Sequence, residues 1–257
     1  MQGERSNAIN IQSLISMKTN TKLNLYNLIL LTLCISVPLA PAWLISDIHA
    51  TDYSDVRKRT LDQAADIVSK MSDEEKAGQV IHIAIPKNYL DEVAISELQK
   101  VRPGGVILFG VNVGKKKEIR ALTKGLQLEM KNLNSPPLFI SIDQEGGRVV
   151  RVEKGVTAFP GALAIGQTKN PSYAFNAGLI TSFELNQLGI NLLLAPVMDV
   201  NNNPENPVIN TRSFGMTLDA GDLAISYERG ARLGGAIPVI KHFPGHGDTN
   251  VDSHLGL

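Results

Sequence analysis

The stretch LFISIDQEGGRVVRV, residues 138–152, decides the fold, because an apolar run ends abruptly in polar residues and glycines. Residues 138–142 predict a β-strand that is buried on both faces, as the strands of parallel sheets are. Asp143 follows at the carboxyl end of this strand, where a carboxylate can accept hydrogen bonds from two hydroxyl groups. Arg151, in the same loop, can donate a fork of hydrogen bonds. The same residues also suit an aspartate that caps a loop and arginines on the surface, so both interpretations stay open at this point.

Further apolar runs flank this strand, and each is short and rich in Val, Ile and Leu. The five candidate strands are residues 79–85, 105–109, 138–142, 191–197 and 236–240. Helices are predicted between them. Ser72 and Glu75 have the spacing of a capping box. Asn170 before Pro171 predicts the start of another helix, which Gly189 closes. The alternation of strands and helices indicates βα units around a parallel sheet.

Two architectures fit such a series, the closed (β/α)8 barrel and the open, doubly wound sheet. An open sheet typically has a Gly-rich phosphate turn after its first strand, whereas barrel enzymes carry catalytic groups at the carboxyl ends of several strands. Here polar clusters follow the third, fourth and fifth strands, and no Gly-rich turn follows the first. We therefore expect an α/β fold of the TIM type, a (β/α)8 barrel.

The length of the chain bears on how much of that barrel is present. A whole barrel takes about 250 residues, and the candidate strands predict about five βα units from residue 79 onward. We expect a barrel that is truncated after about five units. Its open sheet leaves two apolar edges unpaired, which predicts that the chain as it stands is inactive and poorly soluble.

The composition excludes several classes of protein. Twenty-five basic and twenty-five acidic residues give a net charge of zero, so no overall field attracts nucleic acid, and a nucleic-acid partner is not expected. The only cysteine, Cys34, excludes disulfides within the chain and thiolate metal sites. Any chemistry must come from carboxylates, histidines, lysines and hydroxyl groups.

Residues 1–50 have the layout of an unstructured start followed by an export signal. Lys18 and Lys22 precede an apolar stretch at residues 28–37, and prolines and small residues follow it. A membrane span needs about 20 apolar residues, more than this uninterrupted core provides. We expect an exported protein, periplasmic, secreted or membrane-anchored, that meets a membrane only through this signal. The incomplete barrel domain is then expected in residues 51–257.

Two further polar clusters follow the fourth and fifth strands. NLLLAPVMDVNNNPENPVINTRSFG, residues 191–215, is dense in Asn and Pro, which make rigid loops. In it Arg212 suits an oxygen-rich ligand or, alternatively, a structural salt bridge. IPVIKHFPGHGDTNVDSHLGL, residues 237–257, places Lys241 and His242 at the end of the strand. Its histidines and aspartates raise the alternative of zinc, but Pro and Gly prevent the helix that aligns a His-x-x-x-His pair, so no metal is expected.

The three clusters resemble glycoside hydrolase family 3, in its β-N-acetylglucosaminidase branch. The likeness covers about residues 60–257 and is strongest in KHFPGHGDTNVDSH, residues 241–254, with DQEGGRVVR and NPVINTRSFG in the expected order. It implies a hydrolase that releases terminal non-reducing N-acetyl-β-D-glucosamine from a glycan or muropeptide, by a retaining mechanism and without a cofactor. It implies general acid/base catalysis by His254 paired with Asp252. The sugar-binding residues that it implies are Asp143, Arg151, Arg212, Lys241 and His242.

The implied pairing is chemically sound, because an imidazolium can protonate a leaving oxygen while a nearby carboxylate binds its other nitrogen. A retaining mechanism also needs a carboxylate nucleophile. The resemblance implies that this is an aspartate after a later strand, beyond Leu257, and no residue of the chain matches it. Two alternatives stay open: a family 3 β-glucosidase, and a carbohydrate-binding remnant without catalysis because the nucleophile is absent.

Overall fold

The computed structural model of the chain describes residues 42–256, with side chains from residue 55 onward. The chain divides into two compact units, one up to Ser69 and one from Lys70. In the first unit the structure describes helix α2 (Ala42–Ser69), which spans the expected boundary between residues 50 and 51. Most of the expected export signal lies outside the described residues, and it stays a prediction. No helix in residues 42–256 combines the length and the apolar character that a bilayer crossing needs.

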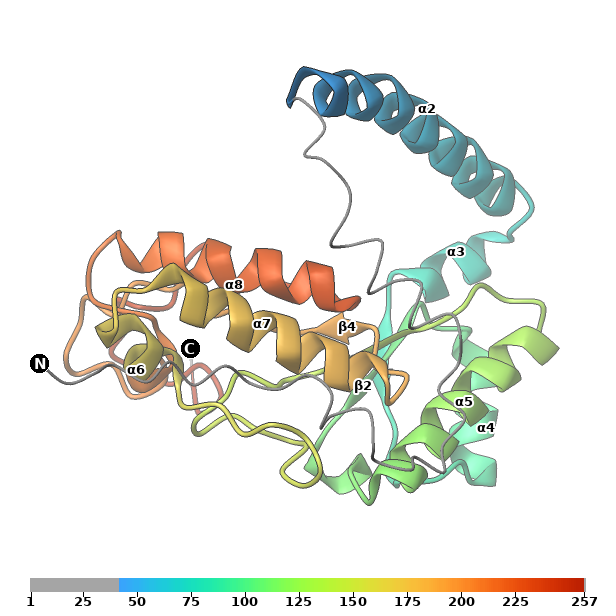
Figure 1. The fold of residues 1–257 in the computed structure, drawn as a ribbon. Coiled ribbons are helices and arrows are strands. Elements are labelled where there is room, and N and C mark those ends of the chain that lie inside the picture. Colours follow the sequence, from blue (N-terminus) through green and yellow to red (C-terminus); the bar gives the residue numbers. More distant parts are fainter. Residues whose placement is uncertain (1–41, 257) are drawn as a thin grey trace, which may run out of the picture. The chain divides into compact units, whose positions relative to one another are not determined.

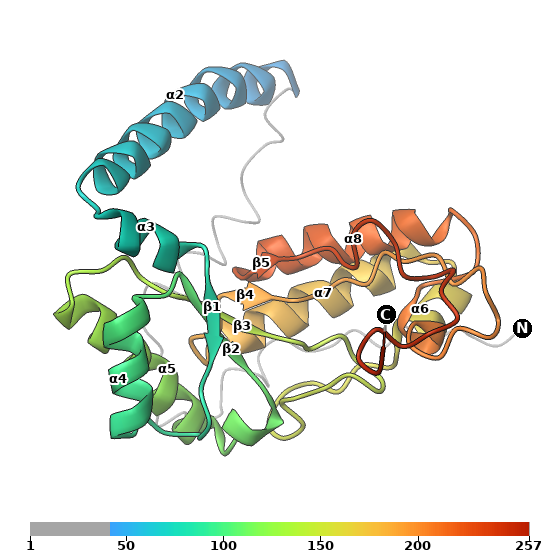
Figure 2. The same ribbon diagram turned by 180° about the vertical axis from the view of Figure 1, so that it is seen from behind.

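The second unit is built on one parallel sheet of five strands, which pair in the order of the sequence (Figure 2). The strands are β1 (His82–Ala84), β2 (Gly105–Leu108), β3 (Phe139–Ile142), β4 (Leu192–Leu193) and β5 (Ile237–Pro238). The five strands that the sequence predicts are therefore present, each shorter than its apolar run. Sequential parallel order is that of a βα barrel. In the described residues no pairing joins β5 to β1, so closure into an eight-stranded barrel stays a prediction.

Proline shortens β4, because it has no N–H to donate to a ladder. Pro196 interrupts the pairing after β4, and the ladder resumes with a parallel bridge between Val197 and Lys241. Lys241 N donates to Pro196 O at 3.2 Å, and its own carbonyl oxygen accepts from Met198 N at 2.7 Å. The backbone of Lys241 is thus fixed at the carboxyl end of the sheet.

Helices follow the strands as the sequence predicts, and their ends carry the expected caps. Ser72 and Glu75 form the capping box at the start of α3, and Asn170 caps α7, which begins at Pro171. The α-helices of this unit are α3 (Asp73–Gln79), α4 (Glu92–Val101), α5 (Lys116–Asn132), α6 (Ala162–Gln167), α7 (Pro171–Asn186) and α8 (Ala220–Gly234). Two 3-10 helices lie in the loops, η2 (Gly110–Asn112) and η3 (Asn210–Arg212).

Helices α7 and α8 lie side by side, and α4 lies beside α5 (Figure 1). The contact between α7 and α8 is close because each presents glycine to the backbone of the other. A Cβ atom on Gly178 would lie 2.1 Å from Tyr227 O, and one on Gly230 would lie 2.0 Å from Phe175 O. The apolar core joins the strands to these helices; its largest fully buried side chains include Leu98, Leu108, Leu126, Met130, Ile140, Ile142, Leu185 and Leu193. The polar residues that follow β3, β4 and β5 then meet at one end of the sheet.

Candidate active site

Lys241, at the end of β5, is the centre of an ion-pair cluster. Its Nζ lies 2.5 Å from Asp143 Oδ1 and 2.6 Å from Glu145 Oε1, both in the loop after β3. Only 14% of the Lys241 side chain is exposed, and 5% of that of Glu145. The ladder with β4 fixes the Lys241 backbone, so the ammonium is held where the carboxyl ends of the strands converge.

Arg212, in η3 after β4, binds the same glutamate from the other side. Its Nε and Nη2 donate to the two oxygens of Glu145 at 2.9 and 2.8 Å, a bidentate pair. Burial is the largest single effect on the pKa of Arg212, and it favours the neutral form. The hydrogen bonds and the charge of Glu145, with smaller contributions from neighbouring carboxylates, outweigh it and raise the pKa of Arg212 above its ordinary value. The salt bridge that the sequence left open is therefore present, and contact of Arg212 with a ligand stays a prediction.

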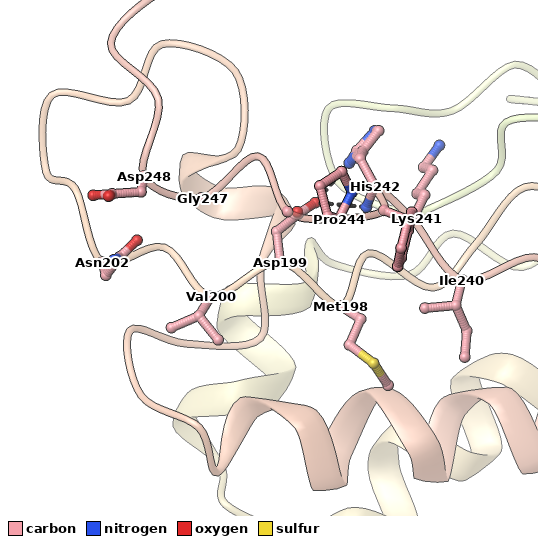
Figure 3. A pocket seen from close by; sticks show the side chains of 12 residues that line it. Met198, Asp199, Val200, Asn202, Ile240, Lys241, His242, Pro244, Gly247 and Asp248 are labelled. Carbon is pink, nitrogen blue, oxygen red and sulfur yellow. Dashed lines mark hydrogen bonds and ion pairs between the residues drawn. The ribbon is translucent and has the colours of Figure 1, made fainter.

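His242 connects this cluster to Asp199, in the loop after β4 (Figure 3). Arg212 Nη2 lies 3.2 Å from His242 Nε2 and can only donate, so Nε2 accepts and the ring proton lies on Nδ1. That Nδ1 lies 2.6 Å from Asp199 Oδ2. The other oxygen of Asp199 accepts from the backbone N of His246 at 2.6 Å. Asp199 thus fixes both the tautomer of His242 and the course of the loop that follows.

The pKa of Asp199 reflects two opposed effects. Burial of its side chain, which is 1% exposed, favours the neutral acid. Hydrogen bonds from the His242 side chain and from the backbones of His246 and His242 outweigh burial, and they hold the pKa of Asp199 below its ordinary value.

Arg151 lies at the outer side of the cluster. Its Nη2 is 3.9 Å from Asp143 Oδ2, a long ion pair, and its Nε is buried without a hydrogen-bond partner among the described residues. Its backbone N donates to Gln144 Oε1 at 2.8 Å, which holds the loop against the end of β3. Arg151 and Asp143 therefore keep hydrogen-bonding capacity that the protein itself does not fully use.

A cavity of about 390 Å³ opens beside Lys241 and His242. Met198 and Asp199 form one side of it, and Asp248 and Asn202 lie at its far end (Figure 3). The cavity brings together two of the predicted site residues. Among the described residues, no group of three or more His, Cys, Asp or Glu side chains is arranged to hold a metal ion.

The predicted acid/base pair lies further along the same loop. His254 Nδ1 is 2.6 Å from Asp252 Oδ1, and the backbone N of His254 donates to the same oxygen at 2.9 Å. Hydrogen bonds from the His254 backbone and then its side chain hold the pKa of Asp252 below its ordinary value, against a small effect of desolvation. The imidazole is 76% exposed, so its Nε2 is open to a ligand.

The structure thus joins Asp143, Lys241, Arg212 and His242 in one network, with Arg151 at its margin. The predicted dyad is a separate pair. In the part of the chain that the structure describes, one hydrogen bond links its segment to the network, between His246 Nε2 and Ser253 Oγ at 3.1 Å.

Sequence reasoning did not assign Glu145, Asp199 or His246 to the site. The motif Asp143-x-Glu145 ahead of two glycines is the signal that points to Glu145, because two carboxylates in one tight loop need cations nearby. Asp199, in the stretch that the sequence predicts to form a rigid loop, is the bridge between His242 and His246.

The chain is similar to known proteins over most of the second unit. The family described as "Glycosyl hydrolase family 3 N terminal domain" matches residues 72–257. Beta-hexosaminidase A of Pseudoalteromonas piscicida is 46% identical over 160 residues, which are 60% of this chain and 27% of that protein. Beta-hexosaminidase of Alkalilimnicola ehrlichii is 39% identical over 163 residues, 61% of this chain and 45% of that protein. The chain therefore spans less than half the length of these two relatives.

Solved structures show the same likeness. The family 3 β-N-acetylglucosaminidase from Paenibacillus sp. superposes with a TM-score of 0.70 at 39% identity, over 72% of this chain and 35% of that one. NagZ from Neisseria gonorrhoeae, in complex with N-trifluoroacetyl-D-glucosamine, superposes with a TM-score of 0.63 at 33% identity, over 69% of this chain and 53% of that one.

Proposed function

The chain belongs to glycosyl hydrolase family 3, and from this premise we propose that its protein releases terminal non-reducing N-acetyl-β-D-glucosamine from glycans by a retaining mechanism. The relatives named beta-hexosaminidase and the neighbouring β-N-acetylglucosaminidase structure support this choice of sugar. The observation that carries the proposal is the hydrogen bond between Asp252 and His254, in a loop that begins at the ion-pair cluster.

The charges of the cluster favour a neutral, hydroxyl-rich ligand. The cluster contains three cations, Arg151, Arg212 and Lys241, and three carboxylates. Asp143 and Glu145 face the cations, and Asp199 faces His242. A balanced cluster offers donors and acceptors to hydroxyl groups without the excess charge that would select an anion.

Burial divides the cluster into an inner and an outer part. Glu145 and Asp199 are 5% and 1% exposed and are saturated by protein donors, so we assign them to holding the others in place. Asp143, Arg151 and His242 are 18%, 32% and 30% exposed, respectively, and we propose that they bind the sugar together with Lys241 and Arg212.

In the proposed reaction His254 transfers the proton. The bond between Nε2 and its proton breaks as the leaving oxygen gains that proton. At the same time the bond from the anomeric carbon to this oxygen breaks, and a carboxylate of the enzyme forms a bond to that carbon. Water then cleaves this glycosyl-enzyme, and Nε2 takes the proton of the water. Asp252 stabilises the imidazolium through Nδ1 and keeps Nε2 directed outward.

The nucleophile is not one of the cluster carboxylates in this proposal. Lys241 binds Asp143 at 2.5 Å and Glu145 at 2.6 Å, and Asp199 is occupied by His242 and His246. Each is engaged by a strong donor, which lowers its reactivity toward carbon. We propose that the nucleophile comes from outside this cluster.

Hydrolysis of aryl β-N-acetylglucosaminides by the protein from its complete reading frame tests the function. We expect His254→Ala to lower kcat/KM by on the order of 10²- to 10⁴-fold for phenyl, a poor leaving group, and far less for 2,4-dinitrophenyl, which needs no proton. Binding of N-acetylglucosamine without cleavage of any substrate would support the carbohydrate-binding alternative. Faster cleavage of the β-glucoside would support the β-glucosidase alternative. An equal loss for both leaving groups would remove His254 from the acid role.

A further inference from the structure

His246 lies between the end of β5 and the dyad, and both nitrogens of its ring are engaged. Nδ1 lies 2.5 Å from Thr249 Oγ1, and Nε2 lies 3.1 Å from Ser253 Oγ. Ser253 is the residue between Asp252 and His254. The ring of His246 therefore connects the start of the loop to the backbone segment that carries Asp252 and His254.

The direction of these hydrogen bonds follows from the available protons. The single proton of the Thr249 hydroxyl is donated to His246 O at 3.0 Å, so the ring proton lies on Nδ1 and is donated to Thr249 Oγ1. Nε2 of the neutral ring is then an acceptor, and Ser253 donates to it. The tautomer of His246 thus provides an acceptor for the serine inside the dyad.

The first half of the loop is firmly attached to the loop after β4. Asn206 Nδ2 donates to His246 O at 2.7 Å, and Asp199 Oδ1 accepts from His246 N at 2.6 Å. A Cβ atom on Gly247 would lie 1.7 Å from Val200 O, so the two backbones are in direct contact. His246 is therefore a fixed point that can hold the second half of the loop.

The second half of the loop is held differently. Among the described residues, the hydrogen bond from Ser253 to His246 is the one that ties residues 251–256 to the remainder of the unit. The other hydrogen bonds of this segment are internal, such as Leu255 N to Asp252 O at 2.9 Å. The side chain of His254 is 76% exposed, so packing does little to fix it.

We infer that His246 is a positioning residue for the general acid/base, holding Asp252 and His254 over the sugar through Ser253. The inference rests on the proposed function, because it assigns His246 a part in the same proton transfer. His246 does not touch the substrate. Its effect is to place His254 Nε2, and a displacement of about 1 Å can cost a catalytic group on the order of 100-fold in rate.

Replacements at His246 and Ser253 separate this role from a general structural one. Asn places its amide near Nδ1 and cannot reach Ser253, whereas Gln places its amide near Nε2 and can. We expect His246→Asn and Ser253→Ala each to lower kcat/KM for the phenyl N-acetylglucosaminide by about 10- to 100-fold, and the 2,4-dinitrophenyl compound by less than about 3-fold. His246→Gln restores most of the activity. The double variant His246→Asn/Ser253→Ala is no worse than either single one, because both remove the same contact.

Controls keep the test decisive. His82→Asn changes an exposed histidine at the start of β1, which stacks on Phe139. His82 lies at the end of the sheet opposite the site, so this variant should leave both rates unchanged. Thermal unfolding checks the fold, since the loss of one exposed hydrogen bond should change Tm only slightly. Hydrogen exchange of the peptide covering residues 247–257 is measured in parallel, and we expect it to be faster in His246→Asn and Ser253→Ala than in the wild type.

The outcomes distinguish the two proposals. If the wild type cleaves no glycoside, the proposed function fails, and the exchange rates still decide whether His246 holds the segment. If the wild type cleaves glycosides but the two substrates lose activity equally in His246→Asn, the positioning role is refuted while the function stands. Unchanged exchange in both variants refutes it as well.

Discussion

Glu145→Gln is the change that most directly tests how the ion-pair cluster is held together. The side chain of Glu145 is 5% exposed and faces two cations that are themselves buried, Arg212 at 10% and Lys241 at 14% exposure. The glutamine keeps the volume and one acceptor oxygen. Its NH₂ group, however, must point at a cation, because Arg212 donates to both oxygens of Glu145 and Lys241 also binds Oε1.

The magnitude follows from the distances. A unit charge pair about 2.7 Å apart attracts by about 6 kcal/mol at an effective dielectric constant of about 20, and Glu145 makes two such pairs. The cost of desolvating the three groups offsets most of that attraction. Removing one partner of a buried ion pair typically lowers the free energy of unfolding by about 3–5 kcal/mol, because the other charge is left unpaired. We expect Glu145→Gln to lower the free energy of unfolding by this amount and to lower Tm by roughly 10 °C.

Urea unfolding followed by circular dichroism at 222 nm measures the effect. Fluorescence is unsuitable, because the only tryptophan, Trp43, lies in the other unit. Glu228→Gln is the matched control: it breaks an i,i+4 pair with Arg232 on α8, whose arginine is 70% exposed, and should cost only about 0.5 kcal/mol. If both variants lose the same small amount of stability, the cluster is not held by Glu145 and the reasoning is wrong.

Two further predictions concern acid stability and helix packing. Asp199 has a pKa below its ordinary value in the folded protein, so the stability that it contributes is present above about pH 4, the unfolded value, and disappears as pH falls through the lower folded pKa. The difference in unfolding free energy between the wild type and Asp199→Asn should therefore shrink as pH is lowered from 6 to 3; a difference that stays constant contradicts this. Gly178→Ala places a Cβ atom 2.1 Å from Tyr227 O between α7 and α8 and should cost about 2–3 kcal/mol by chemical denaturation. Gly221→Ala, on α8 with open space around the new methyl group, should gain up to about 1 kcal/mol instead, and a similar loss in both variants would show that close packing is not the cause.

The elements of the fold were predictable because their signals are local. Apolar runs identified all five strands, and the caps at Ser72 and Asn170 identified the starts of two helices. Gly189 does close α7 as expected: its φ is positive, and the following N–H, from Ile190, donates to Leu185 O. Strand lengths were less predictable. An apolar run reports burial, whereas pairing also needs N–H groups, which Pro196 lacks.

The position of the site was predictable, but the pairing of its side chains was not. Three polar clusters after three consecutive strands indicated one shared end of the sheet, and the structure brings residues from all three into contact. Which side chains pair across that end could not be predicted, since Glu145 and Arg212 are 67 positions apart and Asp143 and Lys241 are 98 apart. Residues that pair over such separations leave no local signal in the sequence.

Burial explains why the sequence did not assign Glu145 and Asp199 to the site. A binding site is predicted from polar groups that a ligand can touch at the ends of strands. Glu145 and Asp199 are nearly inaccessible, and they act on the cations and histidines that face outward. Because a buried carboxylate is stable only when it is paired, each such residue implies donors around it that the sequence does not name. The residues that hold a site in place are thus harder to recognise than those that bind the ligand, although their loss is expected to cost the fold more.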